Sequence, residues 1–213
     1  MTIVHGGLAV AETSAISIDN VHAHGLHLVD AGTPAPTALS GRLADFVANA
    51  RFDRPTLVMD LDAVAERYRV LAAALSPAHI HYAVKANPAP QLLARLAAEG
   101  SNFDVASRGE IEQCLALGIP ASRLSYGNTI KRRADIAFAA AAGVTMFAFD
   151  SEAELTKLAD VAPNTTVYCR VLVDGTGAEW PLGKKFGCAD QMAEDLLIRA
   201  VELGFQRPGI SFH

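Results

Sequence analysis

Residues 79–90 read HIHYAVKANPAP, and this stretch decides how the rest of the chain is interpreted. An apolar, strand-like run reaches Lys85 and is then interrupted at Asn87-Pro88. Proline suits the first turn of a helix, so the break predicts a strand followed directly by a helix. Most lysines are solvated surface residues, but a lysine held at the end of a buried strand is desolvated and its amine becomes available as a nucleophile. Lys85 is therefore the first candidate functional residue.

The same alternation of strand and helix repeats on both sides of this stretch. Further strands are predicted at 55–61, 101–107, 123–128, 145–151, 165–174 and 208–213. Helices are predicted at 62–75, with Asp62 as the cap, and at 89–99, 108–117, 131–142, 151–161 and 189–204. Glycine is expected to end four of them, at Gly100, Gly118, Gly143 and Gly204. Strands that alternate with amphipathic helices predict βαβ units on a parallel sheet.

Two α/β architectures fit this pattern, a doubly wound open sheet and a (β/α)8 barrel. No GxGxxG or GxxxxGK[ST] motif follows the first strand, which argues against a nucleotide-binding open sheet. Polar residues lie at or near the ends of successive predicted strands: Lys85, Asp104, Asn128, Asp150, Arg170 and His213. Any one of them could simply be a polar residue at a solvent-exposed strand end. Barrels, however, build their active sites at the carboxyl ends of their strands. The series therefore favours a barrel, of which about six of the usual eight βα units are predicted here.

Composition narrows the class of protein. The 213 residues are 51% hydrophobic and 19% charged, with a mean hydropathy of +0.22, as expected of a folded globular chain. A net charge of -5 argues against a nucleic-acid-binding surface. No apolar run approaches the roughly 20 residues of a membrane helix, and no signal-peptide pattern is present, so a soluble cytoplasmic protein is expected. Cys114, Cys169 and Cys188 are interpreted as free thiols, because three scattered cysteines suit neither a disulfide framework nor a zinc cluster.

Residues 1–54 are predicted to form an N-terminal extension and linker. The Pro/Gly/Ser/Thr-rich stretch 31–41 is typical of a linker. Before it, His22, His24 and His27 alternate along a strand-like run. Such spacing can bind a metal ion, but a short strand at a sheet edge is the favoured interpretation, so no metal site is predicted.

Seven motifs occur in a fixed order: HYAVKANPAP, FDVASRGEIE, YGNTIK, FAFDSEAEL, VYCRVLVD, PLGKKFG and SFH. Together they resemble the fold-type III pyridoxal-phosphate-dependent amino acid decarboxylases, the ornithine/lysine/diaminopimelate decarboxylase family. The resemblance covers residues 55–213 and implies an alanine-racemase-like (β/α)8 TIM barrel, with residues 1–54 belonging to a β domain. It also implies a homodimer with shared active sites. The family's phosphate-binding loop, pyridine-nitrogen partner and substrate-selecting acids are expected to follow residue 213, which makes this chain an N-terminal part of such an enzyme.

The resemblance assigns three catalytic residues. Lys85 matches the lysine that carries pyridoxal 5'-phosphate (PLP) covalently. Asp104 matches an acidic residue beside the cofactor and the lysine. His213 matches the histidine whose ring stacks on the pyridine.

Three further positions are implied to bind the cofactor. Arg170 matches the arginine near the phenolic oxygen, where a permanent cation favours the ionised form. Glu110 matches a second acid behind the first, with a solvated helix glutamate as the alternative. Asn128 lies in a motif characteristic of the family, as does Asp150, which could equally cap the helix that begins at residue 151.

The function implied is PLP-dependent decarboxylation of a basic amino acid, ornithine or lysine, to a diamine for polyamine biosynthesis. YGNTIK departs from the YANPCK pattern of ornithine decarboxylases, partway towards the diaminopimelate pattern. A diaminopimelate decarboxylase-type enzyme therefore stays open, as does a truncated, non-catalytic or regulatory homologue. A racemase of the same barrel class fits less well, because its motif around the lysine differs.

Overall fold

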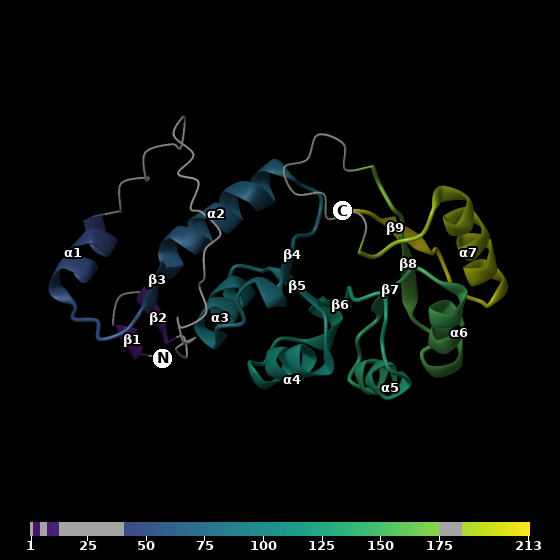
Figure 1. Cartoon of the computed structure of the whole chain (residues 1–213), viewed down its shortest axis with the longest axis horizontal. Coiled ribbons are helices and arrows are strands. Elements are labelled where there is room, and N and C mark those ends of the chain that lie inside the picture. Colours follow the sequence, from purple (N-terminus) through teal and green to yellow (C-terminus); the bar gives the residue numbers. More distant parts are fainter. Residues whose placement is uncertain (1, 5–7, 13–40, 175–184) are drawn as a thin grey trace, which may run out of the picture. The chain divides into compact units, whose positions relative to one another are not determined.

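The computed structural model describes the backbone of residues 2–4, 8–12, 41–174 and 185–213, with side chains for the last two ranges. The chain divides into two units, Met1–Glu66 and Arg67–His213. Figure 1 shows both units in sequence colours. The strand predicted around His22, His24 and His27 lies outside the described residues.

The first unit holds a small antiparallel sheet in the order β1 (Thr2–Val4), β2 (Leu8–Glu12) and β3 (Thr56–Asp60), together with helix α1 (Gly41–Asn49). The domain boundary predicted at residue 54 included β3 in the barrel domain, ahead of the strand that leads to Lys85. In the structure β3 pairs with β2, with Leu8 opposite Asp60 and Glu12 opposite Thr56. The division of the chain into two units also places β3 with the N-terminal residues. This strand therefore belongs with the N-terminal extension.

Helix α2 (Leu61–Ala74) starts in the first unit and ends in the second. The Oδ1 atom of Asp60 accepts hydrogen bonds from the backbone amides of Asp62 and Ala63, at 3.0 and 3.2 Å. Asp60, and not the predicted Asp62, is thus the residue whose side chain satisfies the free amides of the first turn.

The second unit is built on a six-stranded parallel sheet. Its strands are β4 (His81–Ala83), β5 (Asn102–Val105), β6 (Leu124–Tyr126), β7 (Met146–Phe149), β8 (Thr166–Arg170) and β9 (Gly209–Ser211). Their spatial order is the same as their order in sequence. A doubly wound sheet reverses direction at a switch point, whereas a βα barrel advances strand by strand. The α/β barrel architecture predicted from the sequence is therefore confirmed as a six-stranded half-barrel.

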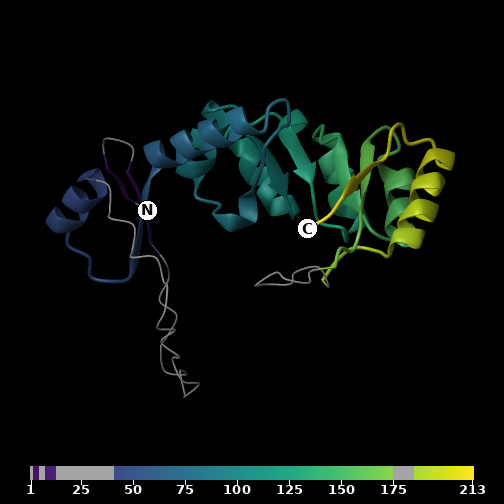
Figure 2. The same cartoon turned by 90° about the horizontal axis from the view of Figure 1, so that it is seen from above.

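Five helices connect these strands: α3 (Pro90–Ala98), α4 (Arg108–Ala116), α5 (Arg133–Ala141), α6 (Glu152–Val161) and α7 (Asp190–Glu202). They lie outside the arc of strands in Figure 1, and Figure 2 shows the same arrangement turned by 90°. Fully buried Phe103, Phe147 and Phe149 on the strands, with Ile111 and Leu155 on the helices, belong to the core of this unit. Among the described residues, no helix is both long and apolar enough to cross a membrane.

The four glycines predicted to end helices do so. Gly100, Gly118, Gly143 and Gly204 have φ between 76° and 97°, a left-handed conformation that is strained for other residues. After Gly118, for example, the amide of Ile119 bonds the carbonyl of Cys114, which closes the end of α4. The three cysteines are free and buried, as predicted.

Candidate active site

An open cavity of about 230 Å³ is formed at the ends of the parallel strands. It is lined by Lys85, Asp104, Ala106, Gly127, Asn128, Arg170, Lys185, Phe186 and His213. Five of the site residues predicted from the sequence are in this lining, whereas Glu110 and Asp150 are not. The five come from segments at or just after β4, β5, β6, β8 and β9. They meet because the carboxyl ends of parallel strands lie along one edge of the sheet.

Lys85 lies in a short 3-10 turn, Val84–Ala86, that follows β4. Its side chain is exposed, in contrast to the shielded amine expected from the sequence. The strand was predicted over 79–86 but ends at Ala83, three residues earlier, so Lys85 projects from the turn and not from the strand. The helix after the break begins at Pro90, where proline occupies the first helical position.

Asp104 on β5 lines the same cavity as this amine. Burial raises the pKa of its carboxyl to about 6, against the opposing effect of Lys85 and Arg170, while the charge of Glu110 adds to the rise. Gly127 lies against the same carboxyl group, and a Cβ atom at Gly127 would overlap it. Asp104 can therefore hold or release a proton near neutral pH beside the Lys85 amine.

Arg170 ends β8 and lies opposite Ser211 of β9 in the sheet register. Its guanidinium carbon is 5.7 Å from the centre of the Phe186 ring, and the Lys185 ammonium is 5.2 Å from the same ring. His213 is exposed at the cavity, two residues after β9. Among the described lining residues, Lys85, Arg170 and Lys185 supply three cations and Asp104 supplies one carboxylate, a balance that suits an anionic ligand.

Glu110 and Asp150 support the backbone around the cavity. Glu110 accepts a hydrogen bond of 2.7 Å from the amide of Ala106, a lining residue, and its own amide donates to the Ser107 hydroxyl at 3.3 Å. Asp150 accepts a bond of 2.9 Å from the amide of Gly187, next to Phe186. The cap of α6 is Ser151, so Asp150 neither caps this helix nor lines the cavity.

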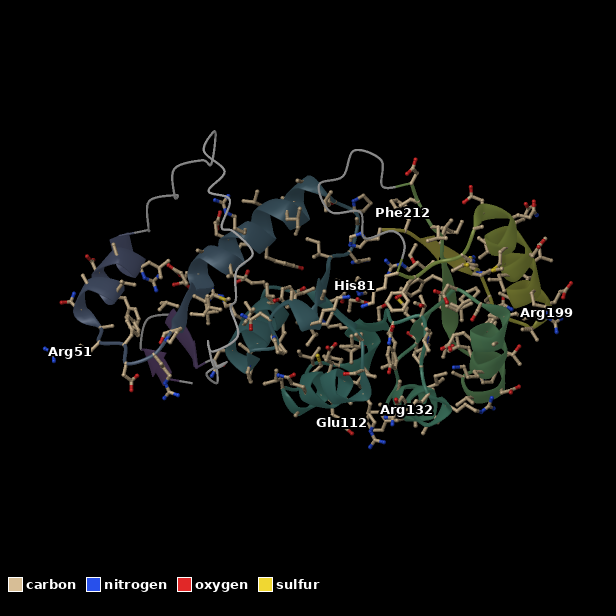
Figure 3. The ribbon with its side chains drawn as sticks, in the orientation of Figure 1. Arg51, His81, Glu112, Arg132, Arg199 and Phe212 are labelled. Carbon is tan, nitrogen blue, oxygen red and sulfur yellow. The ribbon has the colours of Figure 1, made fainter. Side chains whose placement is uncertain are left out.

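Four residues of the lining were not among the predicted site residues: Lys185, Phe186, Ala106 and Gly127. The first two lie in the motif PLGKKFG and the other two in FDVASRGEIE and YGNTIK. Their presence in quoted motifs was the available signal. Outside the cavity, Figure 3 shows Glu112, Arg132 and Arg199 projecting outward from the helical layer, whereas His81 lies among the strands. Within residues 41–174 and 185–213, no group of three or more His, Cys, Asp or Glu side chains is arranged to hold a metal ion.

Comparison with known proteins gives consistent matches. The family model described as "Pyridoxal-dependent decarboxylase, pyridoxal binding domain" matches residues 61–213. The lysine/ornithine decarboxylase of Selenomonas ruminantium is 40% identical over 163 residues, which are 76% of this chain and 42% of that protein. The chain therefore spans less than half the length of this relative.

Two solved structures extend the comparison. The arginine decarboxylase of Paramecium bursaria Chlorella virus is 35% identical with a TM-score of 0.66, over 71% of this chain and 41% of that one. The lysine decarboxylase of Selenomonas ruminantium is 36% identical with a TM-score of 0.71, over 83% of this chain and 46% of that one.

Proposed function

Because the chain belongs to the pyridoxal-dependent decarboxylase family, we propose that it serves the PLP-dependent decarboxylation of a basic amino acid. The observation that carries this proposal is the meeting of Lys85, Asp104, Arg170 and His213 in one cavity. Ornithine and lysine are the preferred substrates, since a lysine/ornithine decarboxylase is among the chain's relatives. The product would be a diamine, as in polyamine biosynthesis. The homodimer implied by the sequence stays a prediction.

The residues of the cavity fit PLP. The cofactor carries an anionic phosphate, an ionisable phenolic oxygen, a planar ring and an aldehyde. Arg170 and Lys185 supply positive charge for the anionic groups, and the rings of Phe186 and His213 offer faces for a planar ligand. Lys85 supplies an exposed primary amine that can attach to the aldehyde. When bound, PLP acts as the electron sink for the carbanion that loss of CO2 leaves.

Each residue of this chain then has a definable task. Lys85 would hold the cofactor through its amine and would yield that position to the amine of the substrate. Asp104, with its pKa near 6, holds a proton close to Lys85 or releases it as the amine changes its charge. Arg170 keeps a permanent positive charge at the cavity, and Asn128 contributes an uncharged polar group to the wall.

The test is to reconstitute the chain with PLP and to follow the absorbance band of lysine-bound cofactor. Lys85→Ala should abolish this band, because the attachment needs the amine at that position. Borohydride reduction followed by peptide mass spectrometry should place the label on the peptide that contains Lys85. Release of CO2 from ornithine, lysine and arginine then ranks the substrates.

Lys185→Ala is the matched control, because it also removes an ammonium group from the cavity lining. It should weaken binding and leave the band in place. An undiminished band in the Lys85→Ala variant, or a label on Lys185, would show that the cofactor site has been assigned to the wrong lysine.

A further inference from the structure

Lys131 is a buried lysine directly behind the cavity wall. It follows β6 in the loop that leads to α5, and its side chain is completely shielded from solvent. Its ammonium group donates to the backbone carbonyls of Asn128 and Ala148, at 2.8 and 2.5 Å, and lies 3.0 Å from Glu154 Oε1. Burial lowers the pKa of Lys131, and the adjacent Glu154 carboxylate opposes that effect.

Glu154, in the first turn of α6, is shared by two ammonium groups. Lys157 Nζ lies 2.5 Å from its Oε2 atom and also donates to the backbone carbonyl of Lys131 at 2.5 Å. Taking such charges out of water costs several kcal/mol, which the ion pairs offset only when their geometry is good. A hydrophobic cluster could fill this space at similar stability, so stability alone is a poor reason for an ammonium group here.

The contacts of Lys131 suggest a different reason. Its Nζ atom joins the loop after β6, through Asn128, to the last part of β7, through Ala148. Asn128 and its neighbour Gly127 line the cavity. Gly127 lies against the Asp104 carboxyl group, and its amide donates to the carbonyl of Val105 at 3.0 Å. The position of this loop therefore sets the distance between the cavity wall and Asp104.

We propose that Lys131 is a positioning residue of the active site, fixing the Gly127–Asn128 segment against Asp104 through its bonds to the Asn128 and Ala148 carbonyls. The inference rests on the proposed function as far as the cofactor is concerned. Lys131 itself lies outside the cavity lining and acts through Asn128.

Three variants separate positioning from folding. Lys131→Met removes the ammonium but leaves Glu154 in the interior with Lys157 as its partner. Lys131→Met/Glu154→Gln also removes the buried carboxylate charge, so it should recover thermal stability without restoring the bond to Asn128. Lys157→Met is the matched control, because it breaks the other ion pair of Glu154 and the bond to the Lys131 carbonyl, but leaves the three contacts of the Lys131 ammonium in place.

The first measurement is amide hydrogen exchange of the peptide spanning 127–131, which needs no cofactor. We expect at least about tenfold faster exchange in both Lys131→Met forms, corresponding to loss of a charge-assisted hydrogen bond, and an unchanged rate in Lys157→Met. The second measurement is the PLP concentration that half-saturates the lysine-bound band. It should rise by about tenfold in the double variant even where its melting temperature matches the wild type.

The results discriminate between the hypotheses. In all three variants, the exchange rate and the PLP affinity could change only in proportion to the melting temperature. This result would overturn the inference, because Lys131 would then be a folding residue only. Wild-type protein without a lysine-bound band would refute the proposed function, whereas the exchange experiment would still decide whether Lys131 fixes the loop. Faster exchange confined to the two Lys131 variants would support the inference.

Discussion

Asp104 is a half-buried acid in which two electrostatic effects oppose each other. Burial favours the neutral carboxyl, and the neighbouring cations Lys85 and Arg170 favour the carboxylate. Burial dominates, so the pKa lies at about 6, above its ordinary value of 3.8. In the folded protein the carboxyl group of Asp104 therefore titrates at about pH 6, just below neutral pH. A residue that exchanges protons with an amine is useful in this range.

This raised pKa makes a prediction about stability. Between pH 4 and 6 the folded state binds more protons at Asp104 than the unfolded state does, so the free energy of unfolding falls as pH rises and levels off above about 6. Asp104→Asn lacks this titration. The gain in free energy of unfolding from this substitution should be larger at pH 7 than at pH 4.5, by about 1–3 kcal/mol, measured by urea unfolding followed by circular dichroism.

A control for this experiment is Asp160→Asn. Asp160 is exposed and paired with Arg133 at 3.1 Å, an arrangement whose contribution is under about 1 kcal/mol. If Asp104→Asn and the wild type show the same pH dependence, the carboxyl of Asp104 ionises normally and its role beside Lys85 must be revised.

At the scale of the elements, the helix ends turn the chain back towards the sheet. Helix α4 shows a side-chain cap at its start and a glycine at its end. The Ser107 hydroxyl accepts a bond from the amide of Glu110 at its start, and Gly118 takes a φ of 76° at its end. Both features are local in the sequence. For this reason the helices and strands could be predicted from the spacing of apolar residues and from the positions of glycine.

Gly118 offers a clean measurement of that backbone requirement. Nothing lies within 4 Å of a Cβ atom built at Gly118, so Gly118→Ala costs only the left-handed backbone conformation. The free energy of unfolding should fall by about 1 kcal/mol. Gly109→Ala, inside the same helix and at ordinary contact distance from Ser107, should leave stability unchanged or raise it by about 0.5 kcal/mol. Thermal unfolding of both variants gives the comparison, and equal effects would show that the φ at Gly118 is unimportant.

Two element assignments needed more than local pattern. The apolar stretch at 56–60 was compatible with a barrel strand, and only its pairing with β2 shows that it belongs to the antiparallel sheet. The run at 79–86 was predicted as one strand, but only His81–Ala83 are extended and Val84–Ala86 form a turn. Pairing partners distant in sequence determine both outcomes, and such partners leave no local signature.

At the scale of the whole molecule, the net charge of -5 contrasts with the cations that line the cavity. Positive charge concentrated in a hollow of an acidic protein attracts anions locally, and dissolved salt screens that attraction. Raising NaCl from about 50 to 500 mM should weaken PLP binding by roughly fivefold. Pyridoxal, which lacks the phosphate, should change less when the same titration is followed by absorbance. Equal salt effects on the two compounds would show that the cavity cations do not bind the phosphate.

The site was predictable to the extent that it follows from strand ends. Lys85, Asp104, Asn128, Arg170 and His213 were selected as polar residues at or near the ends of successive strands, and parallel topology brings such positions together. The burial of Lys131 was not predictable in this way. It depends on Glu154, 23 residues further along the chain.

The consecutive order of β4 to β9 has a consequence for how the protein is made. Each strand of this sheet pairs with the strand synthesised just before it, as with His81 and Asn102 or Phe103 and Leu124. A chain leaving the ribosome can therefore add one finished βα unit to the growing edge without waiting for distant sequence. Lys85 and Asp104, on the first two units, would be side by side on the nascent chain before Arg170 and His213 have been translated.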